Sequence, residues 1–428
     1  MTEVTQPRMA MGMKLPAAIL AAALFALLAF APLASAAPDP VASGSATITL
    51  KSGFVNSLKK QGVKISKISP AKLKGTKATF KVTGGELDPT SGKGTLNLGG
   101  GLKFKHGKKS VSVKGLQLNT AKKALFGKVS GAKVKLASVS GYSFARAGFG
   151  VSLKITKLKL TKAAAKKLNK KLNSKALKGN KLMGSAVAEE QPATVAIIPG
   201  GNVSFKADQG LLLKLKDVET EAKTIAPTTE KGLGNFELPI SGGSIAPTAT
   251  AGQVQTIGGL LLAQKLPTSP TTALETEITL GNMWLDLSAK TVSVEVIAKS
   301  NASPSLNLGN LGRSSIADLT LTGATVSTNA TEHTVAVKDA SATLQPVAAE
   351  VLEGFVKVYQ AYYEQGAYLE ICATKTPNNC ESAIPAEREA EEKGAREAAK
   401  KVAEDRVAKD HITNGNPLGT FSFTVKTQ

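Results

Sequence analysis

The sequence is poor in the residues from which most enzyme sites are built. Its 428 residues include two cysteines, three histidines and one tryptophan, and aromatic residues make up only 4%. It holds no G-x-S-x-G elbow, no P-loop, no H-E-x-x-H pair and no strand-glycine-helix dinucleotide fingerprint. His106, His333 and His411 are scattered and, with only two cysteines, offer no zinc-ligand spacing. We therefore expect a binding protein, not an enzyme, and no metal site.

The first 36 residues have the pattern of an export signal. Arg8 and Lys14 give a positive start, and residues 15–33 form an apolar run broken only by two prolines. The following Ala34-Ser35-Ala36 has the small-residue pattern of a cleavage site. An uncleaved membrane anchor is the alternative, because the apolar run approaches the length of a span. We expect a signal peptide over residues 1–36 and a mature chain that is secreted or cell-surface associated.

Acidic residues are nearly absent from one half of the chain. Residues 44–187 contain 32 basic residues and two acidic ones, Glu86 and Asp88, a net charge of +30. Residues 188–428 contain 20 basic and 28 acidic residues, a net charge of −8. The cationic half predicts either salt-sensitive contact with anionic cell-wall polymers or a membrane surface, or a merely solvated surface. Nucleic acid is disfavoured, because Arg146 is the only arginine there and aromatics for base stacking are few.

The chain contains one pattern twice. Residues 80–102 and 238–260 each hold a Gly-Gly pair, an apolar residue two positions later, a proline two after that, and a final Gly-Gly-Leu. A constant offset of 158 residues aligns the two segments without a gap. Repeats of this length are two copies of one domain and not solenoid units. We expect copy one over residues 44–187 and copy two over residues 193–428.

Both copies have the sequence pattern of β-strands. Short apolar runs, often alternating with polar residues and separated by Gly, Pro, Asn and Lys, are typical of antiparallel sheets. The expected strands are 45–50, 78–82, 94–98, 102–105, 110–118 and 151–160 in copy one, and 204–206, 211–215, 275–280, 283–287, 292–298, 316–321, 334–337 and 420–426 in copy two. Strands and helices do not alternate, which disfavours an α/β fold. The expected class is mainly β, with two tandem antiparallel β-sandwich-like domains or flattened barrels.

A helix is expected near the end of each copy. In copy one Thr161 is a candidate N-cap for a helix with apolar residues at helical spacing. In copy two the equivalent helix continues to about Cys372, and a second helix begins near Pro385. Together they predict a helical hairpin over about residues 346–411, inserted before the last strand. A disulfide between Cys372 and Cys380 would clamp its loop in an oxidising compartment, contributing about 2–3 kcal/mol.

Four of the five tyrosines lie on the first helix of this hairpin, at Tyr359, Tyr362, Tyr363 and Tyr368. Two interpretations are open. The phenol rings could form a stacking or tyrosinate site for a flat ligand, or they could pack the helix on its neighbour with their hydroxyls reaching water.

The segment Gly94–Leu118, in which His106 precedes a polar turn and an alternating strand, resembles the HtaA-type domain of actinobacterial haem-uptake proteins. Lys51-Ser52-Gly53-Phe54 is similar to the Lys and Ser-Phe elements near the start of that domain. The resemblance implies an HtaA-like β fold for both copies, and haem as a ligand held by a tyrosine that a histidine supports. His106 takes the position of the family's histidine, and a solvated turn residue is its alternative interpretation.

Two positions depart from the family pattern. The family's tyrosine falls near Ser57, and Gln264 stands opposite His106 in copy two. The sequence as a whole predicts an exported cell-surface binding protein with HtaA-like domains, with haem as the ligand that the resemblance implies. The alternative is a structural or adhesive wall protein that binds anionic polymers through its lysine-rich first domain.

Overall fold

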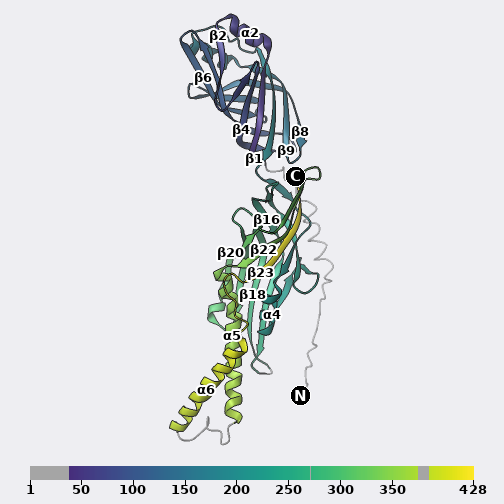
Figure 1. The fold of residues 1–428 in the computed structure, drawn as a ribbon, viewed down its shortest axis with the longest axis vertical. Coiled ribbons are helices and arrows are strands. Elements are labelled where there is room, and N and C mark those ends of the chain that lie inside the picture. Colours follow the sequence, from purple (N-terminus) through teal and green to yellow (C-terminus); the bar gives the residue numbers. More distant parts are fainter. Residues whose placement is uncertain (1–37, 270, 375–384) are drawn as a thin grey trace, which may run out of the picture. The chain divides into compact units, whose positions relative to one another are not determined.

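Strands dominate the protein and form two antiparallel sheets (Figure 1). The computed structural model describes residues 38–269, 271–374 and 385–428, so the expected signal peptide and Cys380 lie outside the described residues. The mainly β class with two antiparallel sheets is confirmed. Among the helices in these ranges, none is both long enough and apolar enough to cross a membrane.

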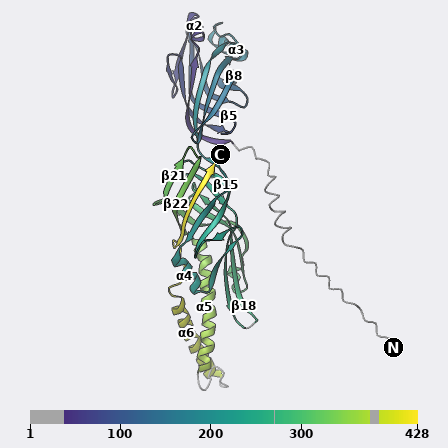
Figure 2. The same cartoon turned by 90° about the vertical axis from the view of Figure 1, so that its right-hand side faces the viewer.

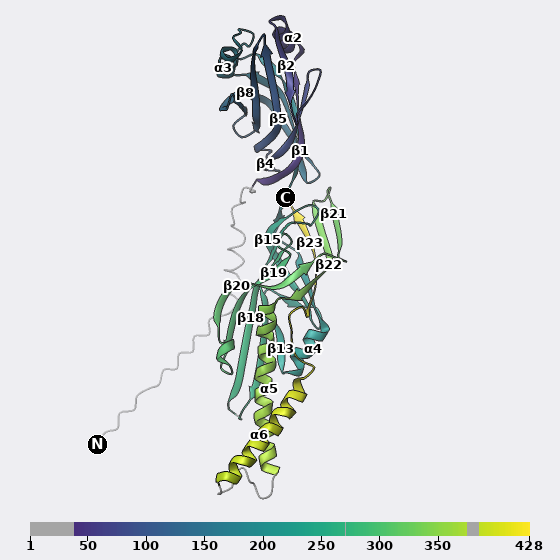
Figure 3. The same cartoon turned by 60° about the vertical axis from the view of Figure 1, so that its left-hand side comes forward.

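The first sheet, in copy one, closes on itself. It contains β1 (Asp39–Leu50), β2 (Val63–Ile68), β3 (Lys72–Lys74), β4 (Lys77–Leu87), β5 (Gly94–His106), β6 (Lys109–Asn119), β7 (Ala124–Val129), β8 (Ala132–Ala147), β9 (Gly150–Leu160) and β10 (Leu182–Pro192). Pairing runs β1-β4-β5-β6-β7-β8-β9-β10 and returns to β1. Alternate residues point inward, and Phe80, Leu96 and Leu153 are fully buried there. Helices α2 (Ser52–Lys60) and α3 (Lys162–Leu172) lie at the same end of this sheet (Figures 2 and 3).

The second sheet, in copy two, closes in the same order. It contains β11 (Val195–Ile198), β12 (Asn202–Ala207), β13 (Thr220–Ile225), β14 (Thr229–Glu230), β15 (Asn235–Ile245), β16 (Gly252–Thr256), β17 (Gly259–Pro267), β18 (Ala273–Asp286), β19 (Thr291–Ser300), β20 (Gly309–Thr320), β21 (Thr325–Asn329), β22 (Thr334–Leu344) and β23 (Pro417–Thr427). Pairing runs β12-β15-β16-β18-β19-β20-β22-β23 and returns to β12. In this circuit β16 and β17 take the place of β5, and β20 and β21 take the place of β8. Both copies therefore use one strand order.

The correspondence extends to single backbone positions. Gly100 in β5 and Gly258 between β16 and β17 both have φ +85°, in the left-handed region. A Cβ on Gly100 would lie 2.5 Å from the Ala71 nitrogen, and a Cβ on Gly258 would lie 2.8 Å from the Thr228 nitrogen. Only glycine lets the two backbone segments approach this closely. The repeated Gly-Gly-Leu motif is therefore the same local structure twice.

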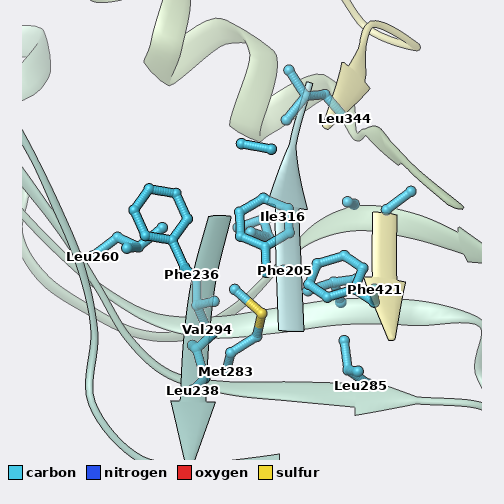
Figure 4. Packing of buried hydrophobic residues seen from close by; sticks show 14 of the residues in the cluster. Phe205, Phe236, Leu238, Leu260, Met283, Leu285, Val294, Ile316, Leu344 and Phe421 are labelled. Carbon is cyan, nitrogen blue, oxygen red and sulfur yellow. The ribbon is translucent and has the colours of Figure 1, made fainter. Parts of the chain in front are cut away.

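Stacked aromatic rings fill the interior of copy two. The Phe205 ring lies 4.7 Å from that of Phe421 and 6.0 Å from that of Phe236, measured between ring centroids. Figure 4 shows these rings beside Met283 and Leu285, with the side chains of several strands meeting in one core. Each sheet thus encloses its own hydrophobic core.

The helices follow their local sequence signals. The Thr161 hydroxyl accepts a hydrogen bond from the Ala164 nitrogen at 3.1 Å, so the expected cap of α3 is confirmed. Helices α5 (Pro346–Thr374) and α6 (Pro385–Val407) run alongside each other as the inserted hairpin (Figure 1). A short 3-10 turn, η1 (Pro304–Leu306), precedes β20.

One strand expected from the sequence, over residues 211–215, is wrong. These residues lie in the helix α4 (Gln209–Asp217). The Asp208 carboxylate accepts a hydrogen bond from the Leu211 nitrogen at 2.9 Å and caps the helix. Leu211 and Leu215, four residues apart, are buried, whereas Leu213 is 59% exposed. The capping side chain and this four-residue spacing outweigh the strand-like run of leucines.

The shared glycine geometry predicts that equivalent glycine substitutions lower the stability of the two copies to a similar extent. We expect Gly100→Ala and Gly258→Ala each to lower the free energy of unfolding by about 2–4 kcal/mol, because a left-handed φ and a backbone clash both oppose a Cβ. Urea denaturation measures the change. Gly53→Ala is the control, since Gly53 lies in α2 with open space around it and should lose no stability. Equal tolerance of alanine at all three positions would contradict the duplicated geometry.

Candidate functional site

His106 ends β5 and anchors a helix instead of lying free in the turn. Its Nδ1 atom lies 3.1 Å from the carbonyl oxygen of Leu172, the last residue of α3. The ring is half-buried, and Gly62 approaches its edge. Because helix C-termini leave carbonyl groups without partners, this hydrogen bond fastens the end of α3 to the β5–β6 hairpin. His106 thus has a structural role that its position before a turn did not indicate.

The surroundings of His106 do not match a haem site. An open hollow of about 450 Å³ lies beside the ring. Its other lining residues are all polar or charged: Gln61, Asn169, Lys170, Asn173, Ser174 and Lys175. Haem needs an apolar slot and an iron ligand, and none of these side chains provides either. The residues present around His106 therefore do not fit the cofactor.

Ser57, near which the family's tyrosine falls, is an exposed residue of α2 and provides no phenol group. Tyr142, the one tyrosine of copy one, lies apart from His106. Tyr142 donates a hydrogen bond to the Gly92 carbonyl oxygen at 2.5 Å, next to the start of β5, whereas His106 ends that strand. In copy two, Gln264 is buried and donates to the carbonyl oxygens of Val218 and Phe355 at 2.7 and 3.0 Å. Gln264 therefore joins the sheet to α5, as His106 joins the sheet to α3.

The four tyrosines of α5 make packing contacts. Tyr359 is buried, and its hydroxyl accepts a hydrogen bond from Arg406 of α6 at 3.3 Å. The Tyr362 hydroxyl donates to the last carbonyl oxygen of β17 at 3.0 Å, and the Tyr363 ring lies 6.1 Å from that of Tyr359. Tyr368 stacks under an arginine of α6 at 4.5 Å, farther along the helix. These contacts hold the hairpin together and against the sheet, and they account for the cluster without a ligand.

The predicted disulfide stays a prediction. Cys372 is buried in α5 against Tyr368, Ile371 and Ala395. Its predicted partner, Cys380, lies outside the described residues.

The lysines of copy one form an outer surface of one charge. Every lysine between residues 44 and 187 is exposed except Lys167, which is half-buried. Across three adjacent strands Lys114 pairs with Lys128, and Lys128 pairs with Lys133. We call these three residues the lysine ladder. Within the fully described span of copy one, no lysine forms an ion pair with an acidic side chain.

The ladder is unfavourable for the isolated fold. Residues directly opposite each other in antiparallel strands have Cβ atoms about 4.5–5.5 Å apart, and like charges there are destabilising. Two further pairs repeat the arrangement: Lys64 lies opposite Lys105, and Lys74 lies opposite Lys77. The Lys133 ammonium is partly accommodated, 5.3 Å from the Phe126 ring centroid. The remaining charges face water.

Copy two carries opposite charges at the equivalent positions. In copy one the register runs Gly101, Lys114, Lys128, Lys133, and in copy two it runs Gly259, Gly281, Glu295, Arg313. The Arg313 guanidinium lies 3.4 Å from the Glu295 carboxylate and 3.4 Å from the Trp284 ring centroid. One strand order therefore supports a charge-paired surface in one copy and an unpaired cationic surface in the other.

Two buried carboxyl groups lie just outside residues 44–187, on the first and last strands of the first sheet. Glu190 in β10 is 3% exposed and Asp39 in β1 is 5% exposed. Burial raises the pKa of Glu190 to about 7, and the nearby Asp39 charge adds to this rise while Arg146 opposes it. Burial likewise raises the pKa of Asp39 to about 6. Near neutral pH Glu190 is therefore only partly ionised, whereas Asp39 stays mostly ionised.

Comparison with known proteins gives a weak likeness of fold. No family model and no curated protein matches the chain. The C-terminal domain of HtaA from Corynebacterium glutamicum is similar over 36% of this chain and 98% of that domain, with 11% identity and a TM-score of 0.30. A domain-swapped dimer of a histidine-to-alanine variant of that domain is similar over 32% of this chain and 90% of its own, with 10% identity and a TM-score of 0.26.

The lysine-rich half is evident in the sequence, but the lysine ladder is not. Lys114, Lys128 and Lys133 are separated by 14 and five residues, and only the strand register brings them side by side. The signal that could have indicated them is the alternation of lysine with buried residues, as in Val113-Lys114 and Lys128-Val129.

Proposed function

We propose that the protein is exported and binds anionic polymers of the cell surface, as a binding protein and not as an enzyme. The proposed binding surface consists of the exposed lysines of copy one, with the lysine ladder among them, and we call it the lysine face. The expected signal peptide over residues 1–36 supports export. The lysine ladder supports an anionic polymer as the ligand. Its like charges oppose one another within the fold, so an external anion is the partner that neutralises them.

Copy two shows which side chains the same strand order carries without the lysine ladder. Glu295 and Arg313 occupy the positions of Lys128 and Lys133 on the same strand order, and they form an ion pair. The fold therefore does not require lysine at these positions. Repulsion between the lysines lowers the stability of the fold, and contact with an external anion relieves that repulsion.

The choice of lysine over arginine favours a polymer with diffuse charge. An ammonium group is a compact, flexible point charge, whereas a guanidinium group recognises one carboxylate or phosphate with fixed geometry. A surface with many exposed ammonium groups holds a phosphate or carboxylate chain in many registers, with an affinity that falls as salt rises.

Replacing the central residue of the ladder separates binding from stability. We expect Lys128→Glu to raise the free energy of unfolding by about 0.5–1 kcal/mol, because it converts two like-charge pairs into opposite-charge pairs. The same change should weaken binding of polyphosphate and of polyglutamate severalfold at low salt. Calorimetric titration of the full mature chain measures the affinity, and urea denaturation measures the stability.

The matched control is Lys338→Glu in copy two. Lys338 is exposed in β22 opposite Thr325, and its replacement changes the net charge by the same amount. We expect binding of either polymer to stay within twofold of the unchanged protein. If both variants lose affinity equally, only the net charge matters; if neither does, the lysine face is a solvated surface. Either result contradicts the proposal.

Haem is the ligand that the family resemblance implies, and it needs its own test. The polar lining beside His106 and the engagement of its Nδ1 with Leu172 favour the polymer instead. We expect that titration of the mature chain with haemin gives no saturable Soret shift that depends on His106. The His106→Ala variant should stay folded and should behave like the unchanged protein in this titration. A tight, His106-dependent Soret shift, insensitive to salt, would establish haem binding and overturn this preference.

A further inference from the structure

A cavity of about 100 Å³ lies inside copy two, where one end of the sheet meets two helices. The strands contribute Phe205, Phe236 and Leu260, which Figure 4 shows on the core side of their strands. Helix α4 contributes Leu211, and the first turns of α5 contribute Leu352. The cavity is therefore part of the space that the helices cover, and not a groove on the outer surface.

The lining of this cavity is apolar. Ser314 and Ser315 are its only polar side chains, and both belong to β20. Water in a cavity needs several polar partners, whereas engineered apolar cavities of about 150 Å³ stay dry and take up molecules such as benzene. A ligand for this cavity must therefore be apolar and slender.

The cavity reaches the surface at one edge. Leu311 and Val347 both line it, and they are 43% and 66% exposed. Ser315, which is also exposed and lines the cavity, belongs to the same strand as Leu311. We call these three residues the mouth. An apolar interior that continues into exposed apolar side chains offers a path from water to the cavity.

Copy one packs the equivalent space more tightly. Its cavity is about 50 Å³. Phe54 of α2 and Leu177, from the segment after α3, both line it. In copy two the smaller Leu211 occupies the place of Phe54 in the equivalent helix, and the lining is completed by residues that include Leu352 of α5 and Leu418 of β23. Interiors are normally close-packed, so the fold does not itself impose the larger void.

The wall of the cavity in copy two is also longer. Strand β19 has 10 residues, whereas its counterpart β7 has six. Leu311 is the bulged residue of β20 beside this extension, between Asn310 and Gly312, and it lies two residues before Arg313 of the charge-paired row. Copy one has the turn Ser130-Gly131 at this place. The mouth is thus an addition specific to copy two.

We infer that this cavity binds the end of an alkyl chain, as in a fatty acid or the acyl group of a lipid. A chain end of a few methylene groups fits a narrow apolar space of this volume, and the rest of the chain leaves through the mouth. The carboxylate or headgroup then remains in water beside Ser315. This site is independent of the lysine face in copy one, so each can fail its test without the other.

Dodecanoate is the probe, used below its micelle concentration with the full mature chain. We expect saturable calorimetric binding. Ala222→Leu, which adds a larger side chain to the lining, should weaken that binding at least tenfold. Circular dichroism checks that the variant is folded. If it is not, Ala348→Leu fills the cavity from the helix side and is expected to have the same effect.

Two matched surface variants distinguish the cavity from general adsorption. Leu311 and Leu308 are 43% and 45% exposed and lie three residues apart, but only Leu311 lines the cavity. We expect Leu311→Ser to weaken binding severalfold and Leu308→Ser to leave it unchanged. Absence of binding, unchanged affinity in the folded cavity-filling variant, or equal losses in the two surface variants would each overturn the inference.

Discussion

Each sheet closes through one strand pair, and glycine makes that pair possible. In copy one β4 meets β5, and a Cβ on Gly85 or Gly94 would clash with the backbone carbonyl of the opposite strand. In copy two β15 meets β16, and Gly243 and Gly252 face the same constraint. The repeated motif in the sequence is therefore the closing seam of both sheets. The enclosed cores, the helices at their ends and the outer faces all depend on that closure.

Because the closed framework is the same twice, its outer positions are free to differ. Copy two pairs Glu295 with Arg313 where copy one places Lys128 beside Lys133. The ends differ as well: α3 is short and held by His106, whereas α5 continues into a hairpin held by Gln264, Tyr362 and Arg406. Charge is thus concentrated in one copy, and the larger apolar cavity lies in the other.

Local signals in the sequence were sufficient for several elements. The capping residue Thr161 marked the start of α3, and Pro385 marked the start of α6. Alternating apolar residues indicated most of the strands. The strand predicted over residues 211–215 was wrong because a run of leucines is compatible with either a strand or a helix. The Asp208 side chain, which caps the helix, is the feature that favours the helix.

The remaining features depend on contacts between distant residues. His106 bonds to a carbonyl group 66 residues away, and this contact gives it a structural role that spacing alone could not indicate. The lysine ladder depends on strand register, which sequence patterns leave open by one or two residues. Closure of the sheets depends on the same register at the glycine seam.

If the proposal is right, the lysine face of copy one is the surface that contacts an anionic polymer. Lysine acetylation footprinting by mass spectrometry, on the full mature chain with and without polyphosphate, tests it directly. We expect lower labelling of Lys114, Lys128 and Lys133 in the presence of the polymer, and unchanged labelling of Lys299 and Lys338 in copy two. Equal protection across both copies, or protection confined to copy two, would contradict it.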